Sequence, residues 1–193
     1  MMKLTGGEAA GAKLFGLKGR DTRPAQARVR NSLFNILQHA IPEARVLDLF
    51  AGTGAVGLEA LSRGAVSCLF IDQNRECIEV IRRNLEKLRW GDRARLVQGS
   101  VFHLGTCLQG PEAVFDLVFV DPPYDFYRKE PSRKSLSEAI RGLVDEGRLA
   151  PQGRVIMENP TGLCLTEAEL SGLTRTDQRQ YHQTELTFFG AKV

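Results

Sequence analysis

The sequence has little of what marks a membrane, secreted or metal-binding protein. No apolar run approaches the roughly 18 residues that a membrane-spanning helix needs, so we expect no membrane segment. The opening residues, MMKLTGGEAAGAK, lack the apolar core of a signal peptide. The four cysteines show no CxxC spacing, which predicts neither a zinc site nor a disulfide framework. We therefore expect a cytoplasmic protein without a metal.

The overall composition is that of an ordinary globular protein. The 193 residues predict one domain or one domain with a short appendage. Hydrophobic residues make up 42% of the chain and charged residues 25%, a balance that allows a buried core. The three histidines, His39, His103 and His182, are isolated in the sequence and are expected to be structural or exposed. A monomer is the expected state.

Positive charge is concentrated at the N-terminal end. Residues 1–30 contain seven basic and two acidic side chains, whereas the remaining 163 residues contain 19 basic and 21 acidic ones. A basic arm on a near-neutral body favours a polyanionic partner contacted through one end, although a solvated terminus is the alternative. We expect residues 1–22 to form a basic arm or hairpin and residues 23–193 to form one domain.

Apolar periodicity predicts strands that alternate with helices. A helix is expected from Pro24, because proline suits a first turn, and it should end at Pro42. The other expected segments are strands at 45–50, 67–72, 95–98, 116–120 and 154–158, helices at 55–63, 78–88 and 134–146, and a terminal strand pair at 174–181 and 185–189. This order predicts an α/β fold: a Rossmann-like, seven-stranded, mostly parallel sheet with helices on both faces, a C-terminal antiparallel strand pair and a short basic N-terminal arm. Ligands should bind at the carboxyl ends of the strands.

A glycine-rich loop follows the first expected strand, in the run DLFAGTGAVG (48–57). Its glycines satisfy the GxGxxG pattern of dinucleotide-binding proteins, and the acidic Asp72 follows at the expected distance. However, the carboxylate of Asp48 would repel a pyrophosphate and suits a cation such as an α-amino group or a sulfonium. The chain also leaves no room for a separate substrate domain. A dinucleotide-dependent oxidoreductase remains as one alternative. A structural glycine turn, with the Asp at the strand end as a helix cap, is another.

The most specific motif is Asp121-Pro122-Pro123-Tyr124, which follows the apolar strand DLVFV. Two successive prolines form a stiff turn, because neither can continue a strand ladder or a helix interior. Asp121 and the Pro122 carbonyl group can accept the two hydrogens of an –NH2 group, and the Tyr124 ring can stack on the base that bears it. The motif therefore predicts group transfer to an amine by positioning. The alternative is a proline turn that only closes the strand.

Together the two motifs resemble those of class I S-adenosyl-L-methionine-dependent methyltransferases. The D-x-F-A-G-T-G run resembles the first motif of that family, and Asp121–Tyr124 resembles the [N/D]-P-P-[Y/F] signature of enzymes that methylate adenine N6, cytosine N4 or guanine N2. The resemblance implies S-adenosyl-L-methionine as cofactor and a flipped-out base if the target lies in a duplex. The implied catalytic residues are Asp121, Pro122, Pro123 and Tyr124. The implied cofactor-binding residues are Asp48, Phe50, Ala51, Gly52, Thr53, Gly54, Asp72, Gln73, Ser100 and Val101.

The first expected helix narrows the resemblance further. The pattern R-P…R-V-R…L-F-N-I-L at 23–37 is similar to the opening of the ribosomal small subunit methyltransferase D family, which methylates guanine N2 in small-subunit (16S) ribosomal RNA. The resemblance extends from about residue 13 to the C-terminus and includes the segments 46–65, 116–124 and 153–159. It implies ribosomal RNA, the small ribosomal subunit or an assembly intermediate as partner. The implied RNA contacts are Arg20, Arg23, Arg28 and Arg30, with the cofactor as an alternative partner of Arg28.

The sequence departs from the family pattern at four positions. Ala27 and Asn31 replace an Asp and a Glu around R-V-R, Asp72 replaces a Glu, and Ser100 replaces an Asp that often reaches the adenine amine. These departures leave the exact substrate open. An amino-methyltransferase that acts on DNA adenine N6, cytosine N4 or a protein amide is the main alternative, and a non-enzymatic RNA-binding module is another.

Overall fold

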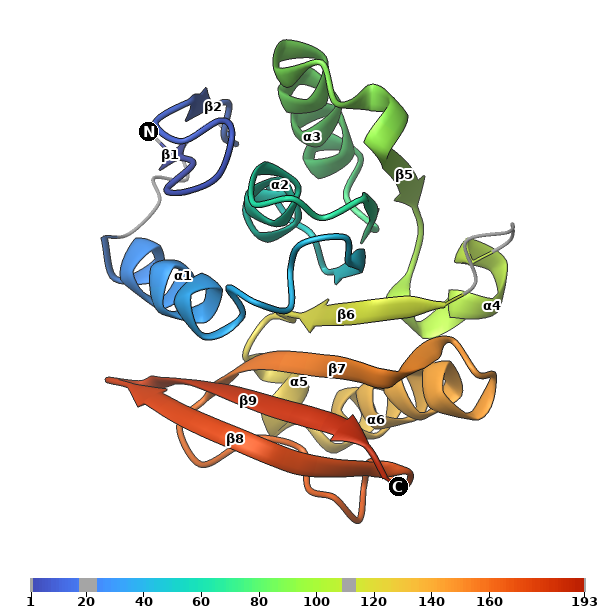
Figure 1. The fold of residues 1–193 in the computed structure, drawn as a ribbon. Helices are drawn as coiled ribbons and strands as arrows, with labels where there is room; N and C mark the ends of the chain where they lie inside the picture. Colours follow the sequence, from blue (N-terminus) through green and yellow to red (C-terminus); the bar gives the residue numbers. More distant parts are fainter. Residues whose placement is uncertain (1, 18–23, 109–113, 193) are drawn as a thin grey trace. The chain divides into compact units, whose positions relative to one another are not determined.

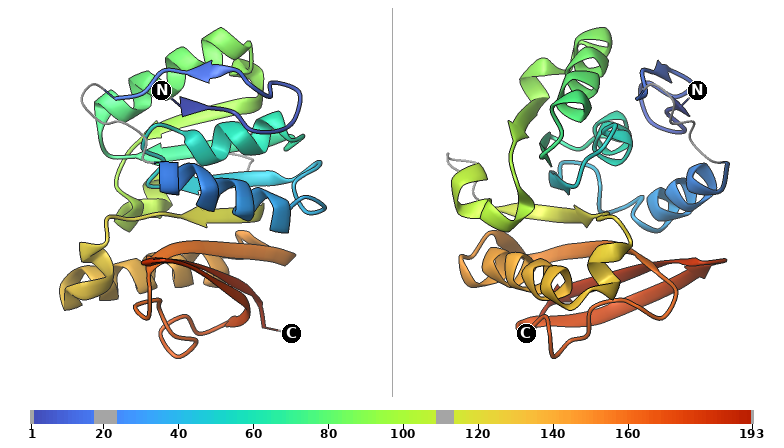
Figure 2. Two further views of the ribbon diagram at one scale, coloured as in Figure 1. Left: turned by 90° about the vertical axis from the view of Figure 1, so that its left-hand side faces the viewer. Right: turned by 180° about the vertical axis from the view of Figure 1, so that it is seen from behind.

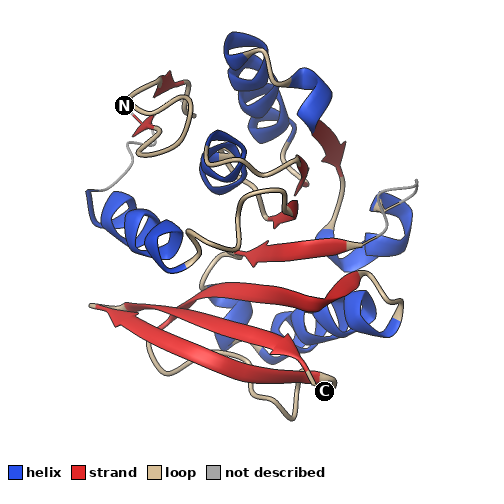
Figure 3. Cartoon of the chain, viewed as in Figure 1, coloured by secondary structure: helices blue, strands red, loops and turns tan. Residues whose placement is uncertain are grey.

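The structure is a computed structural model that describes residues 2–17, 24–108 and 114–192. The chain divides into two compact units, Met1–Gly99 (unit 1) and Ser100–Val193 (unit 2). In unit 1 helices alternate with strands after the first strand pair, and unit 2 ends in three successive strands (Figures 1 and 3). Among the described residues, no helix has the length and apolar character required to cross a membrane.

Unit 1 contains a short N-terminal strand pair followed by a three-stranded parallel sheet. Its strands are β1 (Met2–Lys3), β2 (Lys13–Leu14), β3 (Arg45–Leu49), β4 (Ser67–Asp72) and β5 (Ala94–Gln98). Its helical segments are α1 (Pro24–Ile36), α2 (Ala55–Ser62), α3 (Arg75–Leu88) and the 3-10 turn η1 (Gly91–Arg93). The parallel strands lie in the order β5-β4-β3, with Ile71 of β4 opposite both Leu49 and Val97. The loops that follow β3 and β4 therefore leave the same edge of this sheet.

Helix α3 shows why the sequence pattern predicts its element correctly. Ile78, Ile81 and Leu85 of the predicted apolar stripe are all buried, and each such burial stabilises the fold by about 1.5–3 kcal/mol. The helix begins before the stripe because the Asn74 side chain accepts a hydrogen bond from the Glu76 N–H at 2.8 Å and caps the first turn. It ends at Arg89, which adopts a left-handed conformation.

The N-terminal strand pair is attached to α2. β1 and β2 are antiparallel, with Met2 opposite Leu14, and they lie beside α2 (Figures 1 and 2). The Glu8 N–H donates to the Ser62 carbonyl oxygen at 2.7 Å, and the Thr5 hydroxyl donates to Glu59 at 2.7 Å. Residues 2–14 are thus bound to the rest of unit 1 through α2. The predicted boundary between residues 22 and 23 lies outside the described residues.

A buried carboxylate, Glu59, joins these segments. Its side chain is fully buried and accepts hydrogen bonds from Thr5 and, at 2.8 Å, from Arg63. The Arg30 guanidinium of α1 lies 3.9 Å from the same carboxylate and donates to the Lys3 carbonyl oxygen at 2.9 Å. Burial lowers the pKa of Arg30, and the charge of Glu59 opposes that shift. Glu59 therefore connects the strand pair, α1 and α2 within unit 1.

Unit 2 contains a four-stranded mixed sheet with helices in its crossover. Its strands are β6 (Phe115–Val120), β7 (Leu149–Pro160), β8 (Leu173–Tyr181) and β9 (Thr184–Ala191). Its helical segments are η2 (Val101–His103), α4 (Leu104–Cys107), α5 (Asp125–Arg128) and α6 (Glu130–Asp145). The strand order is β6-β7-β9-β8, with β6 and β7 parallel and the other pairs antiparallel. Helix α6 lies against one face of these strands (Figure 2).

The predicted fold class is confirmed. The described residues form an α/β fold with seven main strands, and the predicted C-terminal antiparallel pair is β8 and β9. Several boundaries differ from the prediction. Helix α1 ends at Ile36 and not at Pro42. Helix α6 begins at Glu130, because Pro131 is accepted in a first turn. Strand β7 begins at Leu149, because a bulge between Phe115 and Leu117 lets its pairing with β6 continue through polar residues.

Gly57 provides a test of how closely α2 packs on β4. A Cβ atom there would clash with the Phe70 ring and lie 2.6 Å from the Cys68 Sγ, and both side chains are buried. We expect Gly57→Ala to lower the free energy of unfolding by about 1–3 kcal/mol, measured by urea denaturation. Gly142→Ala on α6 is the matched control, because no atom lies within 4 Å of its Cβ position. Equal stability of both variants would contradict the close packing at Gly57.

Candidate functional site

The loop after β3 has an unusual backbone. Phe50, Gly52 and Gly54 all have positive φ angles, of 59°, 55° and 75°. Such a conformation is accessible to glycine but strained for a side-chain residue such as Phe50, and strain of this kind concentrates at functional sites. A Cβ atom on Gly52 would find no atom nearer than 3.8 Å. The loop therefore presents accessible backbone to a ligand at the carboxyl end of β3.

Two carboxylates hold this loop in place. Asp72, at the end of β4, accepts hydrogen bonds at 2.8 Å from the N–H groups of Gly52 and Asn74, one with each oxygen. Asp48, which is 3% exposed, accepts a hydrogen bond from the Gly57 N–H in the first turn of α2 at 2.9 Å. A negative charge at this position is also favoured by the dipole of the helix. Asp48 thus stabilises the loop, and its predicted contact with the cofactor stays a prediction.

The residues of this loop fit the predicted cofactor. The structure brings eight of the predicted cofactor-binding residues to the carboxyl ends of β3 and β4: Asp48, Phe50, Ala51, Gly52, Thr53, Gly54, Asp72 and Gln73. Each carboxylate oxygen has two lone pairs, so Asp72 retains acceptor capacity for ribose hydroxyl groups. Gln73 is exposed beside it. The Thr53 hydroxyl donates a long hydrogen bond, 3.7 Å, to the Met2 Sδ and so links the loop to β1.

The other two predicted cofactor residues, Ser100 and Val101, belong to unit 2. The Ser100 hydroxyl accepts a hydrogen bond from the Phe102 N–H at 3.3 Å and caps η2, while Val101 is buried. The Ser100 side chain is therefore engaged locally, as is usual for a serine before a helical turn. Its contact with the cofactor adenine stays a prediction.

The turn Asp121–Tyr124 lies at the carboxyl end of β6. It leads directly into α5, because the Pro123 carbonyl oxygen accepts a hydrogen bond from the Phe126 N–H at 2.9 Å. Tyr124 is 36% exposed, and its hydroxyl shares a hydrogen bond of 2.7 Å with the Thr184 hydroxyl of β9. The exposed ring is thus fixed at its tip, which suits a surface on which a planar base stacks.

A second carboxylate, Glu158, accompanies Asp121. Val120 of β6 lies opposite Met157 of β7, so Asp121 and Glu158 follow on adjacent parallel strands. Loss of solvent around the carboxyl group raises the pKa of Asp121 to about 6, although the residue as a whole is exposed. Burial and the Asp121 charge together raise the pKa of Glu158 to about 8. Close carboxylates that cannot both ionise easily share a proton, and shifted pKa values of this kind are frequent at functional sites.

The predicted site residues include neither Glu158 nor Thr184. The sequence does contain a signal for Glu158. The residue ends the predicted strand 154–158, which is the next predicted strand after the one that leads to Asp121. Thr184 had no local signal, since it follows the turn of the β8–β9 hairpin and reaches Tyr124 only through sheet pairing. Tyr127 helps to fix the backbone of Glu158, because its buried hydroxyl donates a hydrogen bond to the Glu158 carbonyl oxygen at 3.0 Å.

The raised pKa of Glu158 has a measurable effect on stability. Its pKa is about 8 in the folded protein and 4.5 as a free group. Between these values the folded state holds more protons than the unfolded state, so the free energy of unfolding falls as pH rises. Glu158→Gln cannot ionise. We therefore expect the melting temperature of the variant, relative to the wild type, to increase steadily from pH 4.5 to pH 8.

Thermal unfolding at several pH values between these limits checks this expectation. Asp121 is present in both proteins, so the difference reports the titration of Glu158 together with its coupling to Asp121. Glu138→Gln, which neutralises an exposed carboxylate of α6, is the control for the general loss of a negative charge. A difference between Glu158→Gln and the wild type that stays constant with pH would contradict the assignment.

The predicted RNA-binding arginines differ in their surroundings. Arg28 is exposed on α1, whereas Arg30 is buried and bonded to Lys3 and Glu59 within unit 1. Arg20 and Arg23 lie outside the described residues. Of the two described arginines, Arg28 has the accessible surface that a phosphate contact needs, and Arg30 has little. RNA binding by these residues stays a prediction.

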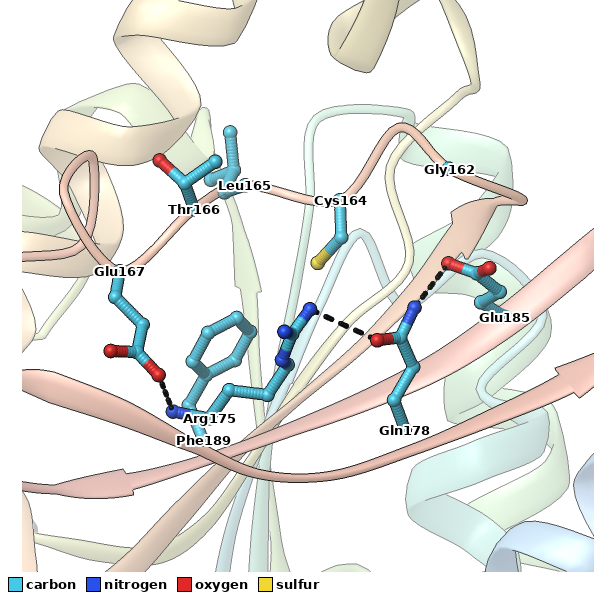
Figure 4. A pocket seen from close by; sticks show the side chains of 9 residues that line it. All are labelled: Gly162, Cys164, Leu165, Thr166, Glu167, Arg175, Gln178, Glu185 and Phe189. Carbon is cyan, nitrogen blue, oxygen red and sulfur yellow. Dashed lines mark hydrogen bonds between the residues drawn. The ribbon is translucent and has the colours of Figure 1, made fainter.

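A separate depression in unit 2 does not fit the predicted chemistry. It has a volume of about 260 Å3, below the range of about 300–1,000 Å3 usual for small-molecule sites. Its polar side chains bond to one another: Arg175 donates to Gln178, and Gln178 donates to Glu185 (Figure 4). These internal bonds give the depression a structural character. In the described part of the chain, no three His, Cys, Asp or Glu residues are grouped to hold a metal ion.

Comparison with known proteins agrees with the geometry of the loop and the turn. Residues 2–190 match the model of a family described as Conserved hypothetical protein 95. The chain is 36% identical over 158 residues to "Ribosomal RNA small subunit methyltransferase D" of Escherichia coli strain K12, which covers 82% of this chain and 74% of that protein. It is 30% identical over 189 residues to "Putative rRNA methyltransferase YlbH" of Bacillus subtilis strain 168, which covers 97% of this chain and 98% of that protein.

A solved structure shows the same fold. The structure of "Putative methyltransferase yhhF from Escherichia coli" superposes on this chain with a TM-score of 0.81 and 31% sequence identity. The superposition covers 99% of this chain and 98% of the other. The whole chain, and not only the two motifs, is therefore similar to methyltransferases.

Proposed function

The chain belongs to the ribosomal RNA small subunit methyltransferase D family of S-adenosylmethionine-dependent methyltransferases, and on that premise we propose that it methylates the exocyclic N2 amine of a guanine in small-subunit ribosomal RNA. Methylation of ribosomal RNA is the activity of the family. The choice of an exocyclic amine rests on one observation, the Asp121–Tyr124 turn with its exposed, anchored ring.

The proposed mechanism uses acceptor groups to position the amine. When bound, the cofactor supplies a sulfonium methyl group that is open to in-line attack. The Asp121 carboxylate and the Pro122 carbonyl oxygen would accept the two hydrogens of the guanine amine, and the Tyr124 ring would stack on the base. Two acceptors favour a pyramidal nitrogen, whose lone pair is then directed at the methyl carbon. The rate enhancement would come from positioning and from negative charge near the developing ammonium.

The proton released from the amine also has a proposed destination. After the N–C bond forms, the nitrogen holds one hydrogen too many and becomes acidic. Asp121, with its pKa near 6, is ionised at neutral pH and is placed to accept this proton. Glu158 on the adjacent strand would itself remain protonated at neutral pH, which limits the repulsion between the two carboxyl groups.

The cofactor would be held in unit 1 by the loop after β3. Asp72 would accept hydrogen bonds from the ribose hydroxyl groups, and the open backbone at Gly52 would allow close approach. The RNA partner is proposed to be the small-subunit ribosomal RNA, free or within a particle, and the exposed Arg28 is a proposed phosphate contact. A monomer would suffice for this reaction.

The experiment that tests the proposal is transfer of labelled methyl groups from S-adenosylmethionine to unmethylated small ribosomal subunits, with duplex DNA in parallel. Mapping of the label to a guanine N2 would support the proposal. Label on DNA alone would be consistent with the proposed mechanism but would contradict the proposed RNA substrate. The absence of any label, together with thermal stabilisation by NADH and none by S-adenosylhomocysteine, would favour the oxidoreductase alternative.

A further inference from the structure

An aromatic side chain of unit 1 is exposed outside the proposed active site. Large exposed hydrophobic side chains are few among the described residues: Phe15, Val66 and Tyr124, of which Tyr124 belongs to the site above. Phe15 follows β2 and is 38% exposed. Single exposed apolar side chains are common on protein surfaces, so the groups around the Phe15 ring decide whether it can bind a partner.

The backbone around Phe15 is held firmly on α3. The Asn84 side chain, fully buried, accepts a hydrogen bond from the Phe15 N–H at 2.8 Å and donates one to the Phe15 carbonyl oxygen at 3.1 Å. Leu17, two residues further on, packs on Cys77 and Val80 of the same helix. The exposed ring is therefore carried on fixed backbone and needs no ordering before it binds a partner.

Two cations of α3 surround the ring. The Arg83 guanidinium carbon lies 4.2 Å from the ring centroid, and the Lys87 ammonium nitrogen lies 5.2 Å from it. Lys87 also donates to the Lys13 carbonyl oxygen at 2.6 Å. Within the described part of the chain, neither cation forms an ion pair with a carboxylate. Their charge is thus available to an external anion.

The neighbouring Arg82 shows the contrast. It is exposed on the same helix, but its guanidinium is paired with Glu79 at 2.8 Å. Arg82 and Arg83 therefore have the same charge and a similar exposure, and they differ in whether a carboxylate of the protein neutralises them. This difference provides a matched control.

We propose that Phe15, Arg83 and Lys87 form a platform for unpaired RNA, on which one base stacks and beside which the two cations bind adjacent phosphates. We call these three residues the Phe15 platform. Aromatic rings and arginine guanidinium planes are the groups on which proteins stack single-stranded bases, and nearby cations bind the backbone. The inference rests on the proposed function, because it assigns an additional contact for the same RNA substrate at a place in unit 1 that the motifs do not include.

The test is a fluorescence anisotropy titration of the full-length protein with a labelled single-stranded RNA of mixed sequence at several salt concentrations. Phe15→Ala should weaken binding by about tenfold, the effect of losing one stacked base. Phe15→Tyr retains a ring and should bind like the wild type. Arg83→Ala and Lys87→Ala should each reduce the slope of log K against log salt by about 0.7, the value for one phosphate of a single strand. Arg82→Ala should leave that slope unchanged.

Methyl transfer to small subunits gives a second readout. Phe15→Ala should raise KM about tenfold and leave kcat unchanged, because the platform would contribute equally to binding in the ground state and the transition state. Thermal unfolding shows whether each variant is folded. Phe15→Leu covers the case in which the alanine variant is unstable, since leucine retains apolar contact with α3 and removes the ring.

Several results would overturn the inference. Equal effects of Arg82→Ala and Arg83→Ala on RNA binding would mean that RNA responds to the general positive charge of α3 and not to the Phe15 platform. Unchanged RNA binding by Phe15→Ala and Phe15→Leu would exclude stacking. Weaker binding to whole subunits with unchanged binding to free RNA would indicate a ribosomal protein as the partner. In all these cases the wild type still methylates ribosomal RNA, whereas a wild type that labels no ribosomal RNA would contradict the proposed function itself.

Discussion

Replacement of Asp121 by alanine should reduce kcat for methyl transfer by about 10^3-fold and leave the affinity for S-adenosylhomocysteine unchanged. The substitution removes one of the two acceptors proposed to hold the amine, together with the negative charge near the developing ammonium. Asp121→Asn retains one acceptor oxygen without the charge and should lose less activity. Single-turnover transfer to unmethylated small subunits, with calorimetry for the cofactor product, measures both quantities.

Asp125→Ala is the matched control for this experiment. Asp125 is an exposed carboxylate four residues along the same segment, and it is paired with Lys129 at 2.7 Å. Its removal should leave the rate within about twofold of the wild type, since surface pairs of this kind contribute little. A wild-type rate for Asp121→Ala would mean that its carboxylate has no part in the reaction. Loss of cofactor affinity in that variant would mean instead that the site had been disturbed as a whole.

Replacement of Glu59 by alanine should lower the free energy of unfolding by about 3–5 kcal/mol. Glu59 is fully buried, and its removal would leave the buried Arg30 without a countercharge. The Arg30 Nε already has no hydrogen-bond partner among the described residues. The Thr5 N–H and hydroxyl would also lose their acceptor. Urea denaturation of the wild type and the variant measures the difference.

An exposed ion pair provides a control for which the expected loss of stability is smaller. Glu79→Ala removes the partner of Arg82 on the surface of α3 and should change the stability by at most about 1 kcal/mol. A second variant that also replaces Arg30, Glu59→Leu with Arg30→Met, should regain part of the lost stability, because no buried charge is then left unpaired. A loss below about 1 kcal/mol for Glu59→Ala would show that water reaches Arg30 in the variant.

The sequence predicts the elements of this fold well where the pattern is local. Apolar stripes and strands identify α3, β3, β4 and β6 because these elements bury one face or both. The length of β7 was underestimated, since the bulge opposite β6 lets polar residues remain in a strand. Such pairing depends on a partner that is distant in sequence, so no local pattern reveals it.

The candidate site shows the same division. The glycine loop and the proline turn are contiguous motifs, and their conformations follow from residue types that permit few others. Asp48 accepts a hydrogen bond from the first turn of α2, which is the helix-capping role that the structural alternative for this motif includes. The internal pairing of Arg30 was hidden, since Glu59 lies on another helix. The position of an arginine in a basic segment of the sequence does not indicate whether its guanidinium group faces water or a buried carboxylate.

The attachment of the N-terminal strand pair has a consequence for the order of folding. Thr5 and Phe15 obtain their bonds from Glu59 and Asn84, which lie 54 and 69 residues later in the chain. Closing loops of this length is entropically slow relative to forming local turns. During synthesis, residues 2–15 leave the ribosome before α2 and α3 and must therefore wait for these helices before they dock. The Phe15 ring, fixed in the finished protein, is thus among the last features of unit 1 to reach its place.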